Sequence, residues 1–380
     1  MFWQREVLRD AVSMTFNQTW EYDLPKTGLL GDLILYLSST ENGQPFLTAE
    51  RWRLIDYITK IEIIGDGSTI IKSYDGRQAV ASAWHDDLVL PTSMWCTGSN
   101  VPHRQFIPIH LGRWLMDELF GLDLSRFNQV TLKITNDATS TQFTTDIKVT
   151  IIAYWIRESA AGLRGYLREE LWKEWDPVAA GTEYSDMPTD LPIRRILLRA
   201  RPGVNTGPVR NVSSMINLMS NIKYTFKTGQ TLVFEGSMRN LGHLSILELG
   251  KYAETNTNVD KTDEEGYEVG VGYVEHGVVS ESSSTTTPSA TGSVGGSHIQ
   301  DSKQEVKNRA TDQPLQGVWK GFGMLHNVPL FRAVKDDLSD LLDPEARKVV
   351  KVDITCATGT TIAGTARNAK NAIILSRLVR

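Results

Sequence analysis

The stretch "GLDLSRFNQVTLKITND", residues 121 to 137, decides the fold, because a similar stretch, "LLDPEARKVVKVDITCATG", returns at residues 341 to 359. In both, a turn that contains aspartate leads into a segment in which apolar and polar residues alternate. This alternation is typical of a β-strand with one buried face. At an offset of 220 residues the apolar positions agree in type, so we expect them to form the cores of two related domains. The matched pairs are Leu122 with Leu342, Val130 with Val350, Leu132 with Val352, and Ile134 with Ile354.

A second match lies earlier in the chain. The segment from Gly67 to Arg77 agrees with the segment from Gly229 to Arg239 at an offset of 162 residues, and in both a hairpin pattern runs into a helical pattern. Two matched units in the same order indicate an internal duplication. The offset grows from 162 to 220 because the second copy holds extra residues, which we place in an insertion at about 251–316.

The insertion contains two kinds of sequence. "GYEVGVGYVE", residues 266 to 275, alternates Tyr and Val with Glu and Gly, which predicts a β-ribbon. "SESSSTTTPSATGSVGGSH", residues 280 to 298, has too few apolar residues for burial to offset the entropy lost on ordering. We therefore expect an exposed loop there, whose deletion leaves folding and self-association intact.

The rest of the chain is dominated by strand patterns, with a few helices at fixed places. Such a mixture predicts a mainly β protein built from sandwich domains and not a parallel α/β sheet. The expected parts are an amphipathic N-terminal arm at 1–13, a first β domain at 14–160, a linker with a helix at 161–190 and a second β domain at 191–380.

Individual elements follow from the periodicity of apolar residues. The expected strands are 14–24, 30–38, 57–64, 69–72, 130–136, 146–157, 193–200 and the C-terminal 371–380. The expected helices are 75–85, 112–120, one within 162–175, 237–252 and 331–342.

Composition excludes several classes of protein. Forty Lys plus Arg against 45 Asp plus Glu, with no long block of either sign, argue against a protein that coats nucleic acid. Cys96 and Cys356 lie too far apart in sequence for a CxxC motif, so we expect neither a disulfide scaffold nor a cysteine-rich zinc site. The longest apolar run, Val149–Ile156, is too short to span a bilayer, and the first residues lack the apolar core of a signal peptide. We therefore expect a soluble protein that is not secreted by that route.

The sequence offers little for catalysis. None of the seven histidines occurs in an HxH or HExxH motif, and no nucleophile elbow or phosphate-binding loop is present, so we expect no enzyme, metal or cofactor. The carboxylate pairs Asp117–Glu118 and Glu264–Glu265 could serve acid–base chemistry in a β-sandwich glycosidase, but adjacent acids more often form a solvated face. The ten tryptophans could form a sugar-stacking platform, but most of them, including Trp84, Trp155 and Trp319, sit in patterns that favour burial.

The N-terminal stretch "MFWQREVLRDAV" predicts a short amphipathic helix, because its apolar residues gather along one side of a helix. This helix either packs on its own domain or docks on a neighbouring subunit or a lipid headgroup layer, and the sequence leaves both options open. The candidate contact residues are Phe2, Trp3, Arg5, Leu8 and Arg9.

The duplication gives the chain a resemblance to a known family. The stretch "FIPIHLGRWLMDELFGLDLSRFNQVTLKITND", residues 106 to 137, and its partner near the C-terminus resemble the double jelly-roll major capsid proteins of tailless icosahedral viruses, the lineage of certain bacteriophages and of the adenovirus hexon. The resemblance covers nearly the whole chain. It implies two tandem jelly-roll sandwich domains in a structural protein that forms homotrimeric, pseudo-hexagonal capsomers.

The resemblance also implies partners and a location. They are neighbouring capsomers, penton or minor capsid proteins and, in some members, an internal membrane, without sequence-specific binding of nucleic acid. The protein would be assembled in the host cytoplasm and reside in the virion, with the insertion facing outward and the N-terminal arm facing the interior, the membrane or neighbouring subunits. The alternative function is a tandem β-sandwich that binds carbohydrate or cleaves glycosides.

Overall fold

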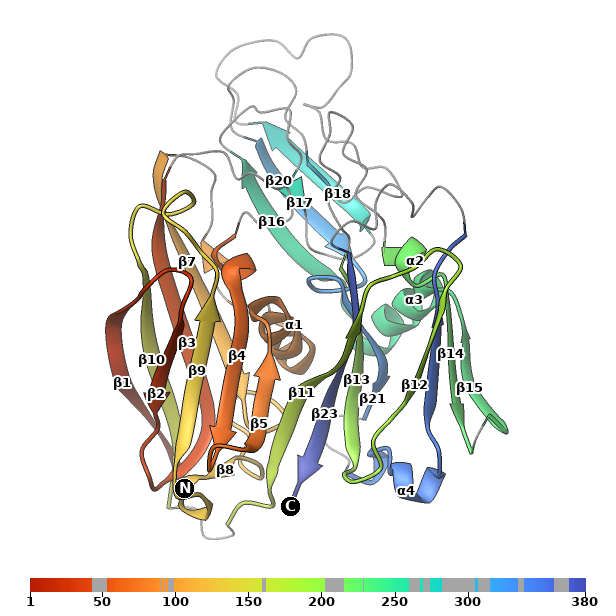
Figure 1. The fold of residues 1–380 in the computed structure, drawn as a ribbon, viewed down its shortest axis with the longest axis horizontal. Coiled ribbons are helices and arrows are strands. Elements are labelled where there is room, and N and C mark those ends of the chain that lie inside the picture. The colour runs from red at the N-terminus through yellow and green to blue at the C-terminus, as the bar shows by residue number, and fades with distance from the viewer. Residues whose placement is uncertain are drawn as a thin grey trace. The chain divides into compact units, whose positions relative to one another are not determined.

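A computed structural model describes most of the chain. The described residues are 1–42, 53–89, 91, 93–94, 99–158, 162–201, 215–227, 229–259, 267–268, 274–281, 305–306, 315–333, 338–358 and 369–380. The chain divides into two compact units, each considered below by itself (Figure 1). Unit 1 comprises Met1–Gln44, Arg53–Leu171 and Leu375–Arg380, and unit 2 comprises Pro45–Trp52 and Trp172–Ile374.

Unit 1 contains eight principal strands in two sheets. The first sheet has the order β1 (Phe2–Met14), β10 (Ile147–Arg157), β3 (Leu29–Asn42) and β7 (Ser99–His110), with the two-residue strands β6 (Ser93–Met94) and β8 (Leu122–Asp123) attached. The second set comprises the first four strands of an eight-stranded sheet, in the order β2 (Thr19–Asp23), β9 (Val130–Asn136), β4 (Ile58–Gly65) and β5 (Thr69–Tyr74). Neighbouring principal strands within each four-stranded set are antiparallel. Counted along the chain, the orders are 1-8-3-6 and 2-7-4-5, which is the strand order of a jelly roll.

The alternation of side chains explains why these segments are strands. Along β10, Ile147, Val149, Ile151, Ala153 and Trp155 are buried, while most residues between them are half-buried. Successive side chains of a strand point to opposite faces, so the first set faces the core and the second faces outward. The expected strands 30–38, 57–64, 69–72, 130–136 and 146–157 are confirmed.

Helix α1 (Gly76–Asp87) follows β5 and confirms the helix expected at 75–85. The side chain of its N-cap, Asp75, accepts a hydrogen bond from the backbone N–H of Gln78, and the backbone N–H of Asp75 donates to the side-chain oxygen of Gln78, which makes a capping box. Its C-cap, Leu88, adopts a left-handed conformation with φ of 55°. The 3-10 turns η1 (Leu54–Tyr57) and η2 (Leu124–Arg126) complete the helical elements described in unit 1.

The second half of the chain repeats this order. One set of strands is β12 (Thr182–Asp186), β22 (Lys351–Thr355), β14 (Asn221–Phe226) and β15 (Thr231–Gly236). The other is β11 (Tyr166–Trp175), β23 (Lys370–Val379), β13 (Ile193–Arg201) and β21 (Asn327–Arg332). Counted from β11, these orders are again 2-7-4-5 and 1-8-3-6. The fold class expected from the sequence, two tandem jelly rolls with short inserted helices, is confirmed.

The two copies match where the sequence repeats. Strand β9 corresponds to β22, and the β4–β5 hairpin corresponds to the β14–β15 hairpin. Helix α1 corresponds to α3 (Met238–Leu249), and each has 12 residues, offset by 162. All eight matched core residues are buried. The short helix α4 (Pro344–Arg347) lies before β22, as η2 lies before β9.

The insertion adds strands of its own to unit 2. A three-stranded sheet has the order β16 (Ala253–Val259), β20 (Leu315–Gly321) and β18 (Val274–Glu281), and β17 (Tyr267–Glu268) pairs with β19 (Glu305–Val306). Residues 282–300, which hold most of the predicted loop, and residues 269–273 of the predicted ribbon lie outside the described residues. The remaining described helical elements are α2 (Met215–Leu218) and η3 (Leu338–Asp340). Among the described helices, none has the length and apolar character needed to cross a membrane.

The predicted N-terminal helix is wrong. Residues Phe2–Met14 form β1, which runs antiparallel to β10 along its whole length. The open side of β10 offers hydrogen-bond partners for this backbone, and Trp3 fits over Gly31, where an added Cβ would lie 2.4 Å from the Trp3 ring. Tertiary pairing therefore overrides a local helical pattern.

The predicted linker helix is also wrong. In place of a helix within 161–190, the described residues from 162 form β11 and β12. On an amphipathic surface helix, charged residues such as Glu169 and Glu170 would face water, but both are buried here. Lys72 and Arg377 pair with them, and Glu169 and Lys72 are register partners on the parallel strands β11 and β5.

Three further predictions need correction. The segment 112–120 is an irregular loop and not a helix, because carboxylates take up its backbone N–H groups. The helix expected at 331–342 is replaced by the end of β21 and by η3, with residues 334–337 outside the described part. The strand expected at 14–24 is confined to β2, because Met14 ends β1 and residues 16–18 turn.

Candidate functional site

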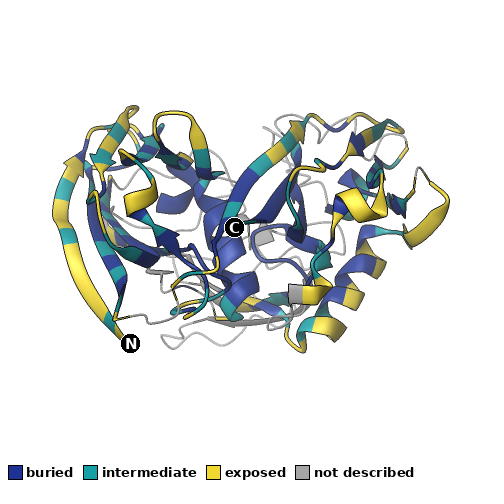
Figure 2. Ribbon diagram, turned by 90° about the horizontal axis from the view of Figure 1, so that it is seen from below, coloured by how far each residue is buried: buried dark blue, intermediate teal, exposed yellow. Residues whose placement is uncertain are grey.

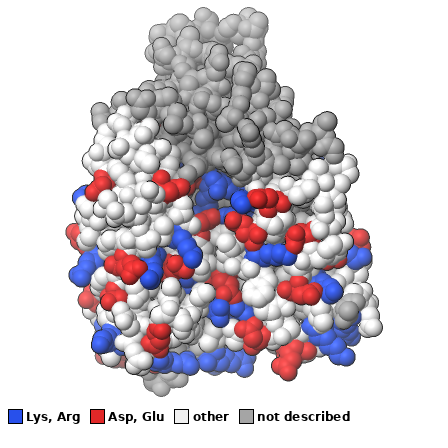
Figure 3. Space-filling model, viewed as in Figure 1, with Lys and Arg blue, Asp and Glu red and all other residues white. Residues whose placement is uncertain are grey.

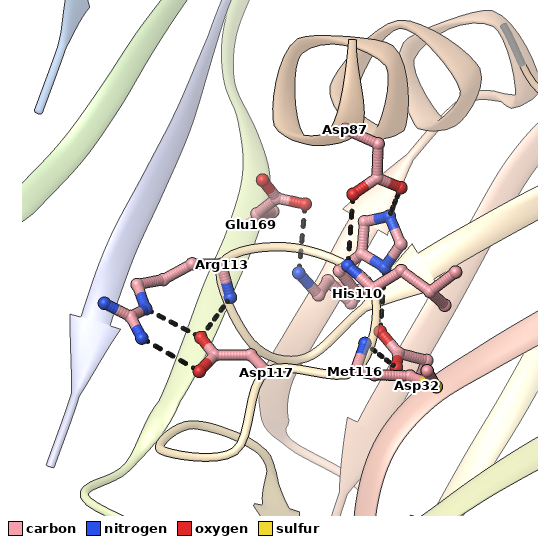
Figure 4. Close-up of polar contacts among 9 residues, drawn as sticks. Asp32, Asp87, His110, Arg113, Met116, Asp117 and Glu169 are labelled. Carbon is pink, nitrogen blue, oxygen red and sulfur yellow. Dashed lines mark hydrogen bonds and ion pairs between the residues drawn. The ribbon is translucent and has the colours of Figure 1, made fainter. Parts of the chain in front are cut away.

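A buried ion cluster centres on His110, at the end of β7. Its Nδ1 lies 2.7 Å from Oδ1 of Asp32 on β3, and its Nε2 lies 3.0 Å from Oδ2 of Asp87, the last residue of α1 (Figure 4). Burial by itself lowers the pKa of His110, but the hydrogen bonds and charges of the two aspartates outweigh burial and raise it to about 10. The imidazole is therefore a cation at neutral pH, held between two carboxylates.

The same two aspartates shape the neighbouring loop. Oδ2 of Asp32 accepts the backbone N–H of Met116 at 3.0 Å, and Oδ1 of Asp87 accepts that of Leu115 at 3.1 Å. Each aspartate thus contacts both His110 and the loop, as Figure 4 shows. The cluster fastens β3, β7, α1 and the loop together, which is a structural role.

Asp117 from the candidate acidic pair lies in this loop and is fully engaged. Its two oxygens bind the Arg113 guanidinium at 2.7 and 2.9 Å and the backbone N–H groups of Arg113 and Leu119. The Arg113 guanidinium also lies 4.0 Å from the centre of the Trp114 ring. Asp117 is buried whereas Glu118 is exposed, so the two carboxylates do not converge on one point as acid–base catalysis requires. The pair Glu264–Glu265 lies outside the described residues.

A second buried cluster joins β5, α1 and β11. Lys72 Nζ and Ser82 Oγ each lie 2.9 Å from an oxygen of Glu169. The next residue, Glu170, pairs with Arg377 of β23 and with Arg168. Since every carboxylate here has a cationic partner within unit 1, the cluster locks strands together and presents no reactive group to solvent.

The described residues show no other constellation that suggests chemistry. Within them, no group of three or more His, Cys, Asp or Glu side chains could hold a metal ion. Cys356 is buried, its thiol donates to the Leu218 carbonyl at 3.1 Å, and burial raises the pKa of the thiol. Cys96 lies outside the described residues.

The three tryptophans whose sequence patterns favour burial do not lie at the surface, so they form no sugar-stacking platform. Trp84, Trp155 and Trp319 are buried, as their sequence pattern predicts. On the face shown in Figure 3, acidic and basic side chains are interspersed and form no large patch of one sign.

The structure places the five predicted contact residues together on β1. Phe2 is 50% exposed, and Figure 2 shows the strand that begins near the N label exposed over much of its length. The Arg5 guanidinium lies over the Tyr154 ring at 5.3 Å, and that of Arg9 lies over the Tyr22 ring at 4.7 Å. Sequence reasoning left out Val7, which is 55% exposed on the same strand.

Sequence reasoning also missed exposed apolar residues on two elements of unit 2. Leu244 and Leu247 of α3 are 43% and 78% exposed, and Leu232 and Val233 of β15 are 54% and 47% exposed. The available signal was that leucines occur around most of the predicted helix at 237–252 and not on one side of it. Leu244 and Leu247 lie three residues apart and therefore on one side of α3, and large apolar side chains exposed next to each other are typical of a protein contact surface.

Comparison with known proteins identifies the fold. No family model and no curated protein matches the sequence. The major capsid protein P2 of bacteriophage PM2 matches with a TM-score of 0.50 and 9% identity, over 100% of this chain and 98% of that chain. The atomic structure of Sulfolobus turreted icosahedral virus matches with a TM-score of 0.55 and 11% identity, over 99% and 90%.

A third match is the PBCV-1 virus capsid, with a TM-score of 0.54 and 9% identity, over 99% of this chain and 93% of that chain. These identities are low, so the likeness is one of fold. It agrees with the strand orders described above, and the chain has the double jelly-roll fold.

Proposed function

We propose that this protein is a structural subunit of a viral capsid, which associates with copies of itself into homotrimers that tile an icosahedral shell. One observation carries the proposal: a single chain holds two complete jelly rolls in tandem, the arrangement shared with the solved capsid proteins of bacteriophage PM2 and PBCV-1. The buried ion clusters support a building role, because their charged groups are consumed in holding strands together.

Symmetry makes the double fold useful for a shell. A trimer of chains with two similar domains supplies six similar jelly rolls, which can occupy a sixfold position in a lattice. Self-association also needs surfaces that can be buried, and the exposed apolar residues of α3, β15 and β1 supply them.

Light scattering on the purified chain tests self-association. We expect a stable species near three times the 42.5 kDa chain mass, because obligate interfaces commonly bury more than about 2,000 Å². A chain that remains a strict monomer at micromolar concentration would contradict the proposal. Binding of a glycan by such a monomer would favour the carbohydrate-binding alternative instead.

A variant of α3 sharpens this test. Leu247→Glu places a charge on the most exposed apolar side chain of α3, and we expect it to shift the mass toward the monomer while leaving the fold intact. Val178→Glu is the matched control, since Val178 is 66% exposed and lies outside α3 and β15. Equal effects of both changes would show that α3 is not part of the interface.

The finer parts of the proposal need intact particles. They are contacts with penton or minor capsid proteins, an internal membrane, assembly in the host cytoplasm and an outward position for the insertion at 251–316. A partner-facing or membrane-facing role for Phe2, Trp3, Arg5, Leu8 and Arg9 belongs with them. Electron microscopy of assembled particles tests these points directly.

A further inference from the structure

The β1 edge, which we define as Arg5–Asp10 with the sequence "REVLRD", lies at the end of a sheet. Among the strands that the structure describes, β1 is terminal in that sheet and pairs with β10 on one side. Five of these six residues are exposed, and Leu8 is half-buried. A long edge of this kind can pair with another strand unless it is protected.

A β-bulge sets the direction of the side chains along this edge. Val7 is opposite Ile152 and Arg9 is opposite Ile151, so Leu8 is an extra residue between them. Ile151 belongs to the inward-facing positions of β10, and Ile152 belongs to the outward-facing ones. Arg9 therefore lies on the inner face, while Val7 lies on the outer face.

The charged residues on either side of the bulge divide between the two faces. Arg5 is opposite Tyr154 and Glu6 is opposite Ala153, so Arg5 lies on the outer face and Glu6 on the inner face. Asp10 accepts a hydrogen bond from Thr150 Oγ1 at 3.1 Å, and Thr150 alternates with the inward Val149 and Ile151 of β10. The outer face thus carries Arg5 with Asp10.

We propose that the β1 edge pairs antiparallel with the β1 edge of a second copy of this chain, with Val7 opposite Leu8. In this register Arg5 lies opposite Asp10 and Glu6 opposite Arg9, so every charged residue of the edge meets one of the opposite sign. Residues directly opposite in an antiparallel pair point to the same face. Without a bulge, Arg5 and Asp10 would point to opposite faces, and the extra residue Leu8 corrects this mismatch.

Neighbouring registers are unfavourable. A slip of one residue in one direction places Arg5 opposite Arg9, and a slip in the other direction places Glu6 opposite Asp10. Like charges directly opposite each other destabilise a strand pair. The charge order therefore selects one register of self-pairing.

The same charges favour a protein partner over a lipid surface. The β1 edge holds two acidic and two basic residues, so it has no net charge to attract an anionic bilayer. The inference deepens the proposed function and rests on it, because that function already requires copies of the chain to meet. Exposed ion pairs on one short strand make a weak contact, which suits repeated contacts between capsomers.

Charge reversal and its rescue test the pairing. In the full chain, Asp10→Arg places arginine opposite Arg5, and we expect the dissociation constant for association beyond the stable oligomer to rise about tenfold or more. Arg5→Asp should have a similar effect. The double variant R5D/D10R restores opposite charges and should return to within about threefold of the original protein. Sedimentation velocity over a range of protein and salt concentrations gives these constants.

Controls separate pairing from folding and from total charge. Asp186→Arg changes an exposed aspartate of β12 in the same way and should leave the association unchanged. Asp10→Asn keeps an acceptor for Thr150 but removes the charge, so it should weaken association even where Asp10→Arg disturbs the strand.

Three results would overturn the inference. In the first, Asp10→Arg and Asp10→Asn leave the dissociation constant unchanged. In the second, the double variant R5D/D10R associates as weakly as either single variant. In the third, the original chain floats with phosphatidylglycerol vesicles and the charge swap does not change its self-association. A stable trimer with any of these results defeats the β1 pairing and leaves the proposed function standing. A strict monomer defeats the proposed function itself.

Discussion

Helices α1 and α3 occupy the same place in the two copies of the fold, but their surroundings differ. Each has 12 residues, follows the matched hairpin and ends in a left-handed C-cap. In α1 every residue except Asp87 is buried, whereas in α3 only Met238, Leu241, Gly242 and Ser245 are buried. The two copies therefore share the backbone structure of this helix but differ in how much of it is buried.

Matched positions show the difference most clearly. Ser82 is buried against Glu169 in α1, while its counterpart in α3 is the exposed Leu244. His85 is buried, while its counterpart Leu247 is 78% exposed. Polar residues are thus inside in the first copy, and apolar residues are outside in the second. The first helix buries its polar side chains, and the second leaves apolar side chains exposed.

The largest expected difference in the free energy of unfolding is between a substitution of Arg77 in α1 and the same substitution of its counterpart in α3, Arg239. Arg77 Nε lies 2.7 Å from the buried Asp56, which also lies 3.5 Å from Arg53, so Arg77→Met removes the shorter of these two ion pairs. We expect a loss of about 3 kcal/mol in the free energy of unfolding, because breaking a buried pair leaves a poorly compensated charge. Arg239 is exposed, and Arg239→Met should cost less than about 0.5 kcal/mol. Chemical denaturation measures both.

An equal loss in the two variants would contradict the view that only the first helix is built into a polar interior. Asp56→Asn provides an independent check, because it removes the charge from the other member of the same pair.

The next effect concerns His110, whose counterpart in the second copy is Phe331 at the offset of 221 residues that aligns Ile107-Pro108 with Val328-Pro329. His110→Gln leaves Asp32 and Asp87 without their shared cation, and we expect it to cost about 2 kcal/mol at pH 7. The pKa of His110 is raised from 6.5 to about 10 in the folded protein, so its stabilising contribution is complete below pH 6.5 and is lost as the pH rises through 10.

The difference between the original chain and His110→Gln should therefore shrink on going from pH 7 to pH 10, by at most about 1.4 kcal/mol per pH unit. Unfolding measured at several pH values follows this difference. A difference that stays constant over that range would show that His110 is not held as a cation. Phe331→Leu in the second copy should show no such pH dependence.

The smallest effect concerns the two C-caps. Gly250 ends α3 with φ of 67°, and nothing lies within 4 Å of where its Cβ would stand, so Gly250→Ala should cost about 1 kcal/mol through backbone strain alone. Leu88, the C-cap of α1, already has a positive φ of 55° with a side chain present, so Leu88→Ala adds no backbone strain and should not lower the free energy of unfolding for this reason. Thermal unfolding of the two variants compares them, and a larger loss for Leu88→Ala would show that its side-chain packing outweighs the backbone effect.

Sequence reasoning succeeded where local pattern and tertiary role coincide. Strands β9 and β22 alternate cleanly because one face of each is buried, and the repeat of Leu132 and Ile134 in Val352 and Ile354 made the duplication visible. It failed where distant residues decide the local structure. The local sequence of 112–120 predicts a helix, but Asp32 and Asp87 bind its backbone N–H groups and hold it as a loop. The local sequence of β11 also predicts a helix, but the segment is a strand whose Glu169 is buried and paired with Lys72.

The contact surfaces were harder to predict than the fold. The residues Phe2, Trp3, Arg5, Leu8 and Arg9 were chosen for a helix, and the strand that replaces it brings Val7, Glu6 and Asp10 into play as well. Nothing in the local sequence shows that β10 has an open side for β1, because that side exists only after the sheet has formed.

The sequence by itself determined that the chain is mainly β, that it is duplicated and which apolar residues form its two cores, because alternation and repetition are properties of the chain alone. Only the tertiary structure decided which charges are buried, which helix is covered and which strand edge is left open. Those outcomes depend on pairs such as His110 with Asp87 and Arg377 with Glu170, whose members are far apart or unremarkable in sequence and gain their meaning when folding removes water from between them.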